Sequence, residues 1–362
     1  MIIYCTKKLA DKLETPVEVI ENEASFFNWS ANLIKHGRKQ ILLLSHSDSK
    51  YPVLVAGILK KDIKHLGRVI HEAIAIQLEY EKVKPEIIQR FLDDGQDVRF
   101  AKLSDRKMVG GLIRWDQELL YRYDLRDVDN GPLPEVSVAL ARVLVTIHKK
   151  NYEYPSDVFF ESFASAYGAQ LFESRGIRLK FTLKMKKTKV WRIITCPLPI
   201  SYKHLHHIIV ESFGWYGSKP HMFKVIDKRT KSIDTIVPYF PETEEEFFEN
   251  SVQATDFDFT QYDIHYYYDP AHTAIIEITS FGWVDKFDKN QPWCEETVGV
   301  ANPDGISPEE FEELIELGTE ELDPSARYFL KHQFESAERY AKIDLINRRL
   351  SDVIQTRPDT FV

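Results

Sequence analysis

Histidine and aspartate side chains gather in the second half of the chain, where they could bind a metal ion or act as general bases. The group comprises His204, His206, His207, His221, His265 and His272, with Asp263 and Asp269 nearby. A metal site requires three or four such groups to converge, and the spacing of these residues does not enforce convergence. We therefore favour structural or solvated roles and assign no metal ligand. A metal-dependent hydrolase that uses His206 and His221 remains an alternative.

A basic stretch from Arg175 to Arg192 contains no acidic residue and could contact the phosphates of a nucleic acid. Apolar and basic residues alternate over 177–186, which predicts a strand with one buried face. Its outward cations are Arg178, Lys180, Lys184 and Lys186. The same lysines could instead protect an edge strand from aggregation, and the acidic run Glu242–Glu249 could neutralise them. Nucleic acid is the one partner that this pattern suggests, and the oligomeric state stays open.

Two tryptophans and one arginine accompany this strand. Trp191 and Trp215 could stack on bases or line a groove, but large aromatic side chains more often anchor a core, and we expect them there. Arg192 could pair with a buried carboxylate such as Asp269, because a guanidinium group binds carboxylates in a bidentate manner. Asp269 also precedes Pro270, an order that is typical of a tight turn.

The remaining composition excludes several classes of protein. No phosphate-binding glycine loop, nucleophile elbow or dinucleotide-binding motif is present, so we expect no cofactor and no demonstrable catalytic activity. Three separate cysteines without metal-ligand spacing fit a reducing compartment. The longest aliphatic runs are too short to cross a bilayer. With a formal net charge of −9 at pH 7, the pattern indicates a soluble, cytoplasmic protein without a membrane segment.

A length of 362 residues predicts two domains. Short strands and helices alternate in the first part, including a helix over 62–79 and another over 134–149. In the second part, Ser201 is placed to cap a helix that stops at Gly214. We predict an α+β fold in which each domain is a mainly antiparallel sheet packed with helices. The predicted division is a domain at 1–150, a helical linker at 151–176, a domain at 177–350 and a tail at 351–362.

The second domain resembles a known family through several short motifs. These are Phe181-Thr182-Leu183, Val190-Trp191-Arg192-Ile193, Leu205-His206, Phe213-Gly214-Trp215, His221 with Phe223, and Ile346-Asn347-Arg348-Arg349-Leu350. The family is named for the third open reading frame of an Ri plasmid, and its members are often labelled TnpR-like passenger proteins of insertion elements. The likeness covers about residues 177–350. It makes Trp191, Arg192, His206, Trp215, His221 and Asp269 the candidate signature residues.

This chain also departs from the family pattern. Tyr268-Asp269 is retained, but Ala274 and Ile276 stand where the family usually has Trp and His. The first domain is similar to a separate family of unknown function that opens with the residues found here at Cys5 to Leu9. The resemblance implies a non-catalytic binding or accessory protein associated with plasmids or mobile elements. A nucleic-acid-binding accessory protein that uses the basic strand 178–192 is the other alternative.

Overall fold

The chain folds into two compact units, Met1–Glu173 and Ser174–Ile354, each with its own core. The computed structural model describes residues 1–20, 25–125, 128–147, 151–168, 170–317, 324–351 and 353. Most of the predicted tail at 351–362 lies outside these residues. Among the described helices, none is both long enough and apolar enough to span a lipid bilayer.

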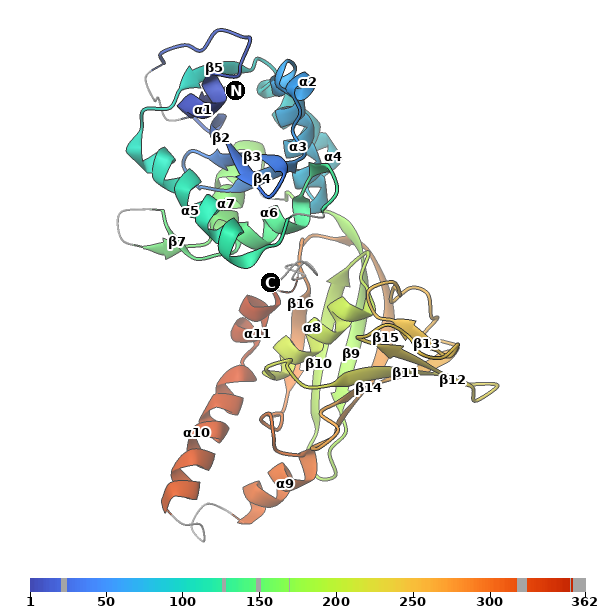
Figure 1. Ribbon diagram of the computed structural model, residues 1–362. Coiled ribbons are helices and arrows are strands. Elements are labelled where there is room, and N and C mark those ends of the chain that lie inside the picture. Colours follow the sequence, from blue (N-terminus) through green and yellow to red (C-terminus); the bar gives the residue numbers. More distant parts are fainter. Residues whose placement is uncertain are drawn as a thin grey trace. The chain divides into compact units, whose positions relative to one another are not determined.

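The first unit is a mixed sheet with helices on both faces (Figure 1). Its strands are β1 (Ile2–Cys5), β2 (Asn28–His36), β3 (Lys39–His46), β4 (Pro52–Ala56), β5 (Arg99–Lys102), β6 (Gly131–Pro132), β7 (Val145–Thr146) and β8 (Tyr152–Glu153). Its helices are α1 (Lys7–Ala10), α2 (Lys60–Ile63), α3 (Leu66–Tyr80), α4 (Pro85–Asp94), α5 (Arg106–Arg122), α6 (Pro134–Ala141) and α7 (Pro155–Tyr167).

The order of the main sheet is β5-β1-β2-β3-β4-β6, in which β1 runs parallel to both of its neighbours and the other pairs are antiparallel. Strand β3 explains why helices cover both faces. Its residues Ile41 and Leu43 pack with α5, whereas Leu42 and Leu44 pack with α3 and α7. A strand with apolar side chains on both faces must be covered on both faces.

Helix α7 lies inside the segment 151–176 that we expected to link the domains. Phe159 and Phe163 of this helix are fully buried in the core of the first unit. This burial makes α7 a part of that unit, and the chain passes to the second unit after Glu173.

The second unit is built on an eight-stranded sheet of order β13-β12-β11-β14-β15-β9-β10-β16. Its strands are β9 (Ser174–Leu183), β10 (Val190–Pro197), β11 (His221–Asp227), β12 (Ile233–Val237), β13 (Glu246–Phe248), β14 (Tyr262–Tyr268), β15 (Ala274–Phe287) and β16 (Trp293–Val298). Its helices are α8 (Tyr202–Phe213), α9 (Pro308–Leu317), α10 (Pro324–Tyr340) and α11 (Ile343–Leu350). All neighbouring strands are antiparallel except β12 and β13.

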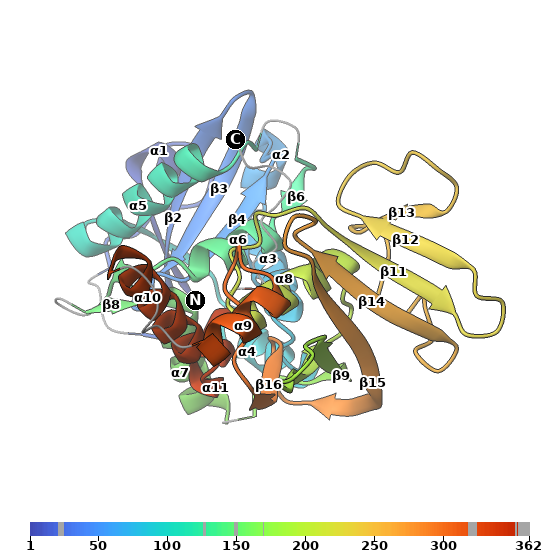
Figure 2. The ribbon, with the colours of Figure 1, turned by 90° about the horizontal axis from the view of Figure 1, so that it is seen from below.

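Helix α8 lies against one face of this sheet and forms the core with it (Figure 1). Figure 2 shows strands β11 to β14 projecting to one side of β9 and β15. The two units together confirm the predicted two-domain α+β layout, with the difference that the first sheet is mixed.

Candidate functional site

Helix α8 positions the central histidine of the candidate site. The Ser201 hydroxyl accepts a hydrogen bond from the backbone N–H of His204 at 3.3 Å, which caps the start of the helix as predicted. Gly214 ends the helix in the left-handed conformation, with φ of 78°. Between these two caps, His206 lies on the buried side of α8 beside Leu205 and Ile209.

His206 and His221 come together as a stacked pair. The ring centroids are 3.6 Å apart and the ring planes differ by 8°. His206 comes from α8 and His221 from the first position of β11. The side chain of His221 is only 8% exposed, so the pair is shielded from solvent.

Hydrogen bonds occupy both histidines. His206 Nδ1 lies 2.8 Å from the hydroxyl oxygen of the buried Tyr266, and the His206 ring also bonds the backbone of Gly217. His221 Nε2 lies 2.9 Å from Oε2 of Glu249. Burial first, and then the neighbouring His221 and His207, hold the pKa of His206 well below its usual value. His206 is therefore neutral in the folded protein at neutral pH.

These contacts describe a packing cluster more closely than a metal centre. Across the described part of the chain, no group of three His, Cys, Asp or Glu side chains is arranged to hold a metal ion. Three other histidines that we considered from the sequence lie apart from this pair and have different neighbours. His204 contacts the Ser201 cap, His265 lies beside Lys184 and Glu277, and His272 lies 3.5 Å from Asp269.

Arg192 is a buried clamp between main-chain segments. Its guanidinium group donates to the carbonyl oxygens of Ser212 at 3.1 Å, Trp191 at 2.9 Å and Val298 at 2.8 Å. It also lies over the ring of Phe213, 4.9 Å from the centroid. Burial lowers the pKa of Arg192 to about 10. The group remains charged at neutral pH and ties the end of α8 to β10 and β16.

Asp269 has other partners than Arg192. Its carboxylate lies 3.9 Å from Lys219 Nζ and 3.5 Å from His272 Nδ1. The backbone N–H of His272 donates to the Asp269 carbonyl at 3.0 Å, so a tight turn starts at Asp269. The backbone of Asp269 has φ of 52°, in the left-handed region that Asp tolerates better than most residues. The pairing of Arg192 with Asp269 that we considered is therefore not found, because Arg192 binds main-chain carbonyl groups and Asp269 starts this turn.

The two tryptophans differ in burial. Trp215 is in the core and stacks on Tyr268, with ring centroids 4.9 Å apart and an angle of 3° between the ring planes. Its Nε1–H donates to the Asn302 carbonyl at 2.8 Å. Trp191 is half-buried on the opposite face of the sheet, with Lys180 Nζ 4.6 Å from its ring centroid. The core position that we expected is thus found for Trp215 but not for Trp191.

Strand β9 lies inside the sheet between β15 and β10, so its cations do not guard an edge. Arg178 pairs with Glu295 at 2.6 Å, Lys180 lies over Trp191, and Lys186 lies 3.6 Å from Glu309. Lys184 is exposed beside His265. The acidic run 242–249 is not the source of these carboxylates, and its last member, Glu249, pairs with His221.

Cations and aromatic rings share the sheet face opposite α8, which we call the outer sheet face. Its members are Arg178, Lys180, Trp191, Lys224, Tyr267 and Phe281. Besides the pair formed by Lys180 and Trp191, Arg178 lies 5.6 Å from the ring centroid of Phe281 and Lys224 lies 4.9 Å from that of Tyr267. These side chains alternate along their strands with buried residues such as Leu179 and Tyr266, which places them on one face.

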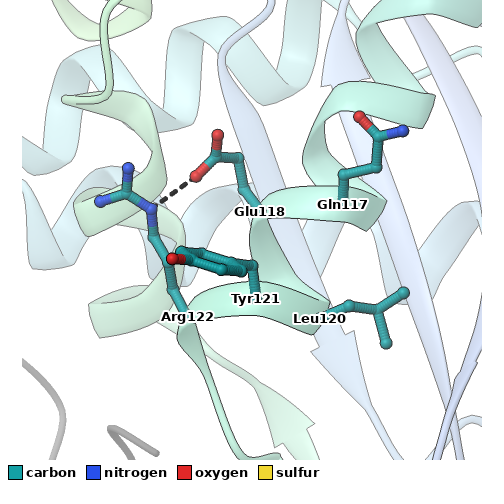
Figure 3. A pocket seen from close by; sticks show the side chains of 5 residues that line it. All are labelled: Gln117, Glu118, Leu120, Tyr121 and Arg122. Atoms are coloured by element: carbon teal, nitrogen blue, oxygen red, sulfur yellow. Dashed lines mark hydrogen bonds and ion pairs between the residues drawn. The ribbon is translucent and has the colours of Figure 1, made fainter.

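A shallow pocket of about 580 Å³ lies on the first unit at the last turns of α5 (Figure 3). It is lined by Gln117, Glu118, Leu120, Tyr121 and Arg122. Arg122 Nε donates to Glu118, and Leu120 and Tyr121 are exposed. No residue that we predicted from the sequence lines this pocket.

Sequence reasoning missed the partners Tyr266 and Glu249. They lie 60 residues from His206 and 28 residues from His221, respectively, so no local spacing reveals the contacts. One signal was available for Tyr266. It shares the apolar face of β14 with Tyr268, and a buried tyrosine hydroxyl usually requires a partner.

Comparison with known proteins gives two family matches, one in each unit. Residues 2–158 match the family described as a domain of unknown function, DUF6933. Residues 175–341 match the family described as plasmid pRiA4b ORF-3-like protein. No curated protein matches the chain. Among solved structures, a protein of unknown function from Methanosarcina mazei Go1 is 21% identical with a TM-score of 0.38, covering 43% of this chain and 86% of that one.

Proposed function

We propose that the second unit is a non-catalytic binding module that holds single-stranded nucleic acid on its outer sheet face. In this proposal the protein is an accessory factor associated with plasmids or mobile elements, an association supported by the plasmid named in the matched family's description. A cytoplasmic location would suit this role.

The observation that carries the proposal is the interleaving of cations and aromatic rings on one exposed face. Lys180 with Trp191, Arg178 with Phe281 and Lys224 with Tyr267 supply positive charge beside flat apolar surfaces. Lysine and arginine bind phosphates, and aromatic rings stack on unpaired bases with little regard to sequence. The combination fits a single strand better than a duplex, whose bases are already stacked.

The charge balance of the face predicts modest affinity. Glu295 pairs with Arg178, and the exposed Glu277 and Asp263 lie on the same side of β15 and β14. These carboxylates repel phosphates, so binding should depend on a few lysines and weaken as salt is added, with a slope set by that small number of phosphate contacts.

The test is the binding of a fluorescent oligothymidylate over a range of salt concentrations. Changing Lys180, Lys184 and Lys186 together to Glu should reduce the slope of log affinity against log salt by about two, since each lost phosphate contact removes roughly 0.7. Trp191→Ala should weaken binding about tenfold through lost stacking. The matched control changes the exposed Lys331, Arg339 and Lys342 of the α10 region to Glu. Binding that is absent, insensitive to salt, or equally reduced in both triple variants would overturn the proposal.

A metal-dependent hydrolase that uses His206 and His221 is the competing function. It requires stoichiometric metal in the purified protein and loss of that metal when both histidines are changed to Ala. His206 argues against it, because its Nδ1 bonds the Tyr266 hydroxyl and its ring also bonds the backbone of Gly217, which leaves no ring nitrogen for a metal ion. The bond between His221 and Glu249 does not decide the question, since metal-bound histidines also bond carboxylates through their second nitrogen.

A further inference from the structure

The hairpin between β9 and β10 encloses a carboxylate with backbone N–H groups. The N–H groups of Lys186, Lys187 and Thr188 donate to the Glu312 carboxylate at 3.0, 2.8 and 2.7 Å. The Thr188 hydroxyl adds a fourth hydrogen bond at 3.0 Å. Successive backbone N–H groups that converge in this way form a nest, which is a general binding geometry for anions.

The groups around the nest are also suited to an anion. Lys186 Nζ lies 3.6 Å from Glu309, and Lys187 Nζ bonds Glu316, so two lysines flank the hairpin. Both lysine side chains are at least half exposed, whereas Glu312 is only 3% exposed. Burial alone would raise the pKa of Glu312, but the hydrogen bonds from the hairpin outweigh it and lower the pKa. Glu312 therefore sits in the nest as an anion.

Helix α9, which carries Glu312, is strongly acidic. Its ten residues include Glu309, Glu310, Glu312, Glu313 and Glu316 and no basic residue. The three carboxylates that reach the hairpin are spaced along one side of the helix, at positions i, i+3 and i+7. They present to the hairpin a row of negative charge that resembles the phosphates of a strand.

We propose that the β9–β10 hairpin is a phosphate-binding site, which Glu312 occupies in the unliganded protein and which a phosphate group of a bound strand takes over. This inference rests on the proposed function, since the hairpin continues β9, the strand that supplies Arg178 and Lys180 to the outer sheet face. Displacement of Glu312 would release α9 from Lys186 and Lys187 and make both lysines available to the nucleic acid.

The first experiment empties the nest in the full-length chain and supplies inorganic phosphate. Glu312→Ala should lower the melting temperature in chloride, and phosphate at equal ionic strength should restore it, because a ligand that binds only the folded state stabilises it. The wild type should gain little, since Glu312 competes with the ion. Glu313→Ala, which removes an exposed neighbouring carboxylate, is the matched control and should behave as the wild type. Equal effects of phosphate on all three proteins would overturn the proposal.

The second experiment asks whether the phosphate of a strand uses the same site. The isosteric Glu312→Gln guards against misfolding of the alanine variant. It should bind a terminally phosphorylated oligothymidylate about tenfold more tightly than the wild type does, as expected for one additional charge-assisted hydrogen bond. A gain in phosphate binding without a gain in strand affinity would overturn the nucleic-acid link and identify a site for free phosphate. If no variant binds strands, the proposed function fails, while the phosphate rescue still decides whether the nest binds anions.

Discussion

The buried histidines give the protein a specific response to acid at the scale of single residues. His46 lies within 2.9 Å of the Ser49 hydroxyl and within 2.9 Å of the Phe26 carbonyl, and it is almost completely buried. Burial lowers its pKa to about 4, although the Phe26 carbonyl and Asp48 act in the opposite direction. The pKa of His206 is lowered for the same main reason. Both residues are neutral in the native state.

We predict that acid destabilises the first unit through His46. In the unfolded chain this histidine takes up a proton near pH 6.5, whereas the folded protein resists protonation until about pH 4. Stability is therefore full above the unfolded pKa and is lost as the pH falls between these two values. The loss is about 3 kcal/mol in total at roughly 1.4 kcal/mol per pH unit.

Urea unfolding of the wild type and of His46→Asn over this pH range measures the effect. The variant should show a shallower decline in stability because the titrating group is gone. His332→Asn, at an exposed position on α10, is the control and should leave the decline unchanged. Parallel pH profiles for the wild type and His46→Asn would contradict the assignment.

At the scale of elements, Gly214 ends α8 at a point where its backbone packs closely against Tyr340 of α10. Gly214 has φ of 78°, and a Cβ atom there would lie 2.7 Å from the Cβ of Tyr340. Gly214→Ala should therefore destabilise the second unit by at least about 2 kcal/mol, from backbone strain together with the clash. Differential scanning calorimetry of the purified variant measures the change.

Substitutions at two other glycines distinguish the cost of backbone strain from the cost of the clash with Tyr340. Gly282 has φ of 104° but open space around its Cβ position, so Gly282→Ala should cost about 1 kcal/mol from strain alone. Gly110 lies inside α5, and a Cβ atom added there would have no neighbouring atom within 4 Å outside the helix backbone. Gly110→Ala should therefore stabilise the first unit by about 0.5–1 kcal/mol. An equal cost for Gly214→Ala and Gly282→Ala would show that the contact with Tyr340 is unimportant.

The elements that the sequence predicted well are those whose signals are local. The alternation in β9, the Ser201 cap and the Gly214 stop each depend on residues within one element, and all three are found in the structure. The predicted helix over 134–149 ends at Ala141, because Val145 and Thr146 pair with β8 instead. Helix α6 is buried on nearly all sides, so its apolar pattern does not mark where it ends.

The candidate site was harder to predict because its geometry depends on strand order. Placing β9 in the middle of the sheet decides that Arg178 meets Glu295 and that Lys180 meets Trp191. Neither pairing has a sequence signature, since the side chains that meet Arg178 and Lys180 come from β15, β10 and β16, which follow β9 at different distances along the chain. The same order brings Arg192 to main-chain carbonyl groups rather than to a carboxylate.

At the scale of the whole molecule, each unit has a separate core and a separate buried polar cluster. In the first unit, Arg142 binds Glu81 through two hydrogen bonds of 3.0 and 2.8 Å, and the Tyr51 hydroxyl donates to Glu81 at 2.8 Å. In the second unit, the buried polar cluster consists of His206, His221, Tyr266 and Glu249, which are joined by hydrogen bonds and ring stacking. Since the two cores share no residues, damage to one cluster should remain confined to its own unit.

Glu81→Ala tests this independence. Removing the carboxylate leaves the Arg142 guanidinium buried without its partner, which should destabilise the first unit by about 3–5 kcal/mol. Hydrogen exchange followed by mass spectrometry should show faster exchange throughout 1–173 and unchanged exchange in 174–354. The double variant Glu81→Ala with Arg142→Met should recover part of the loss, because it removes the unpaired charge as well. Faster exchange in both units, or no recovery in the double variant, would mean that the units unfold together or that the ion pair is not what stabilises the first one.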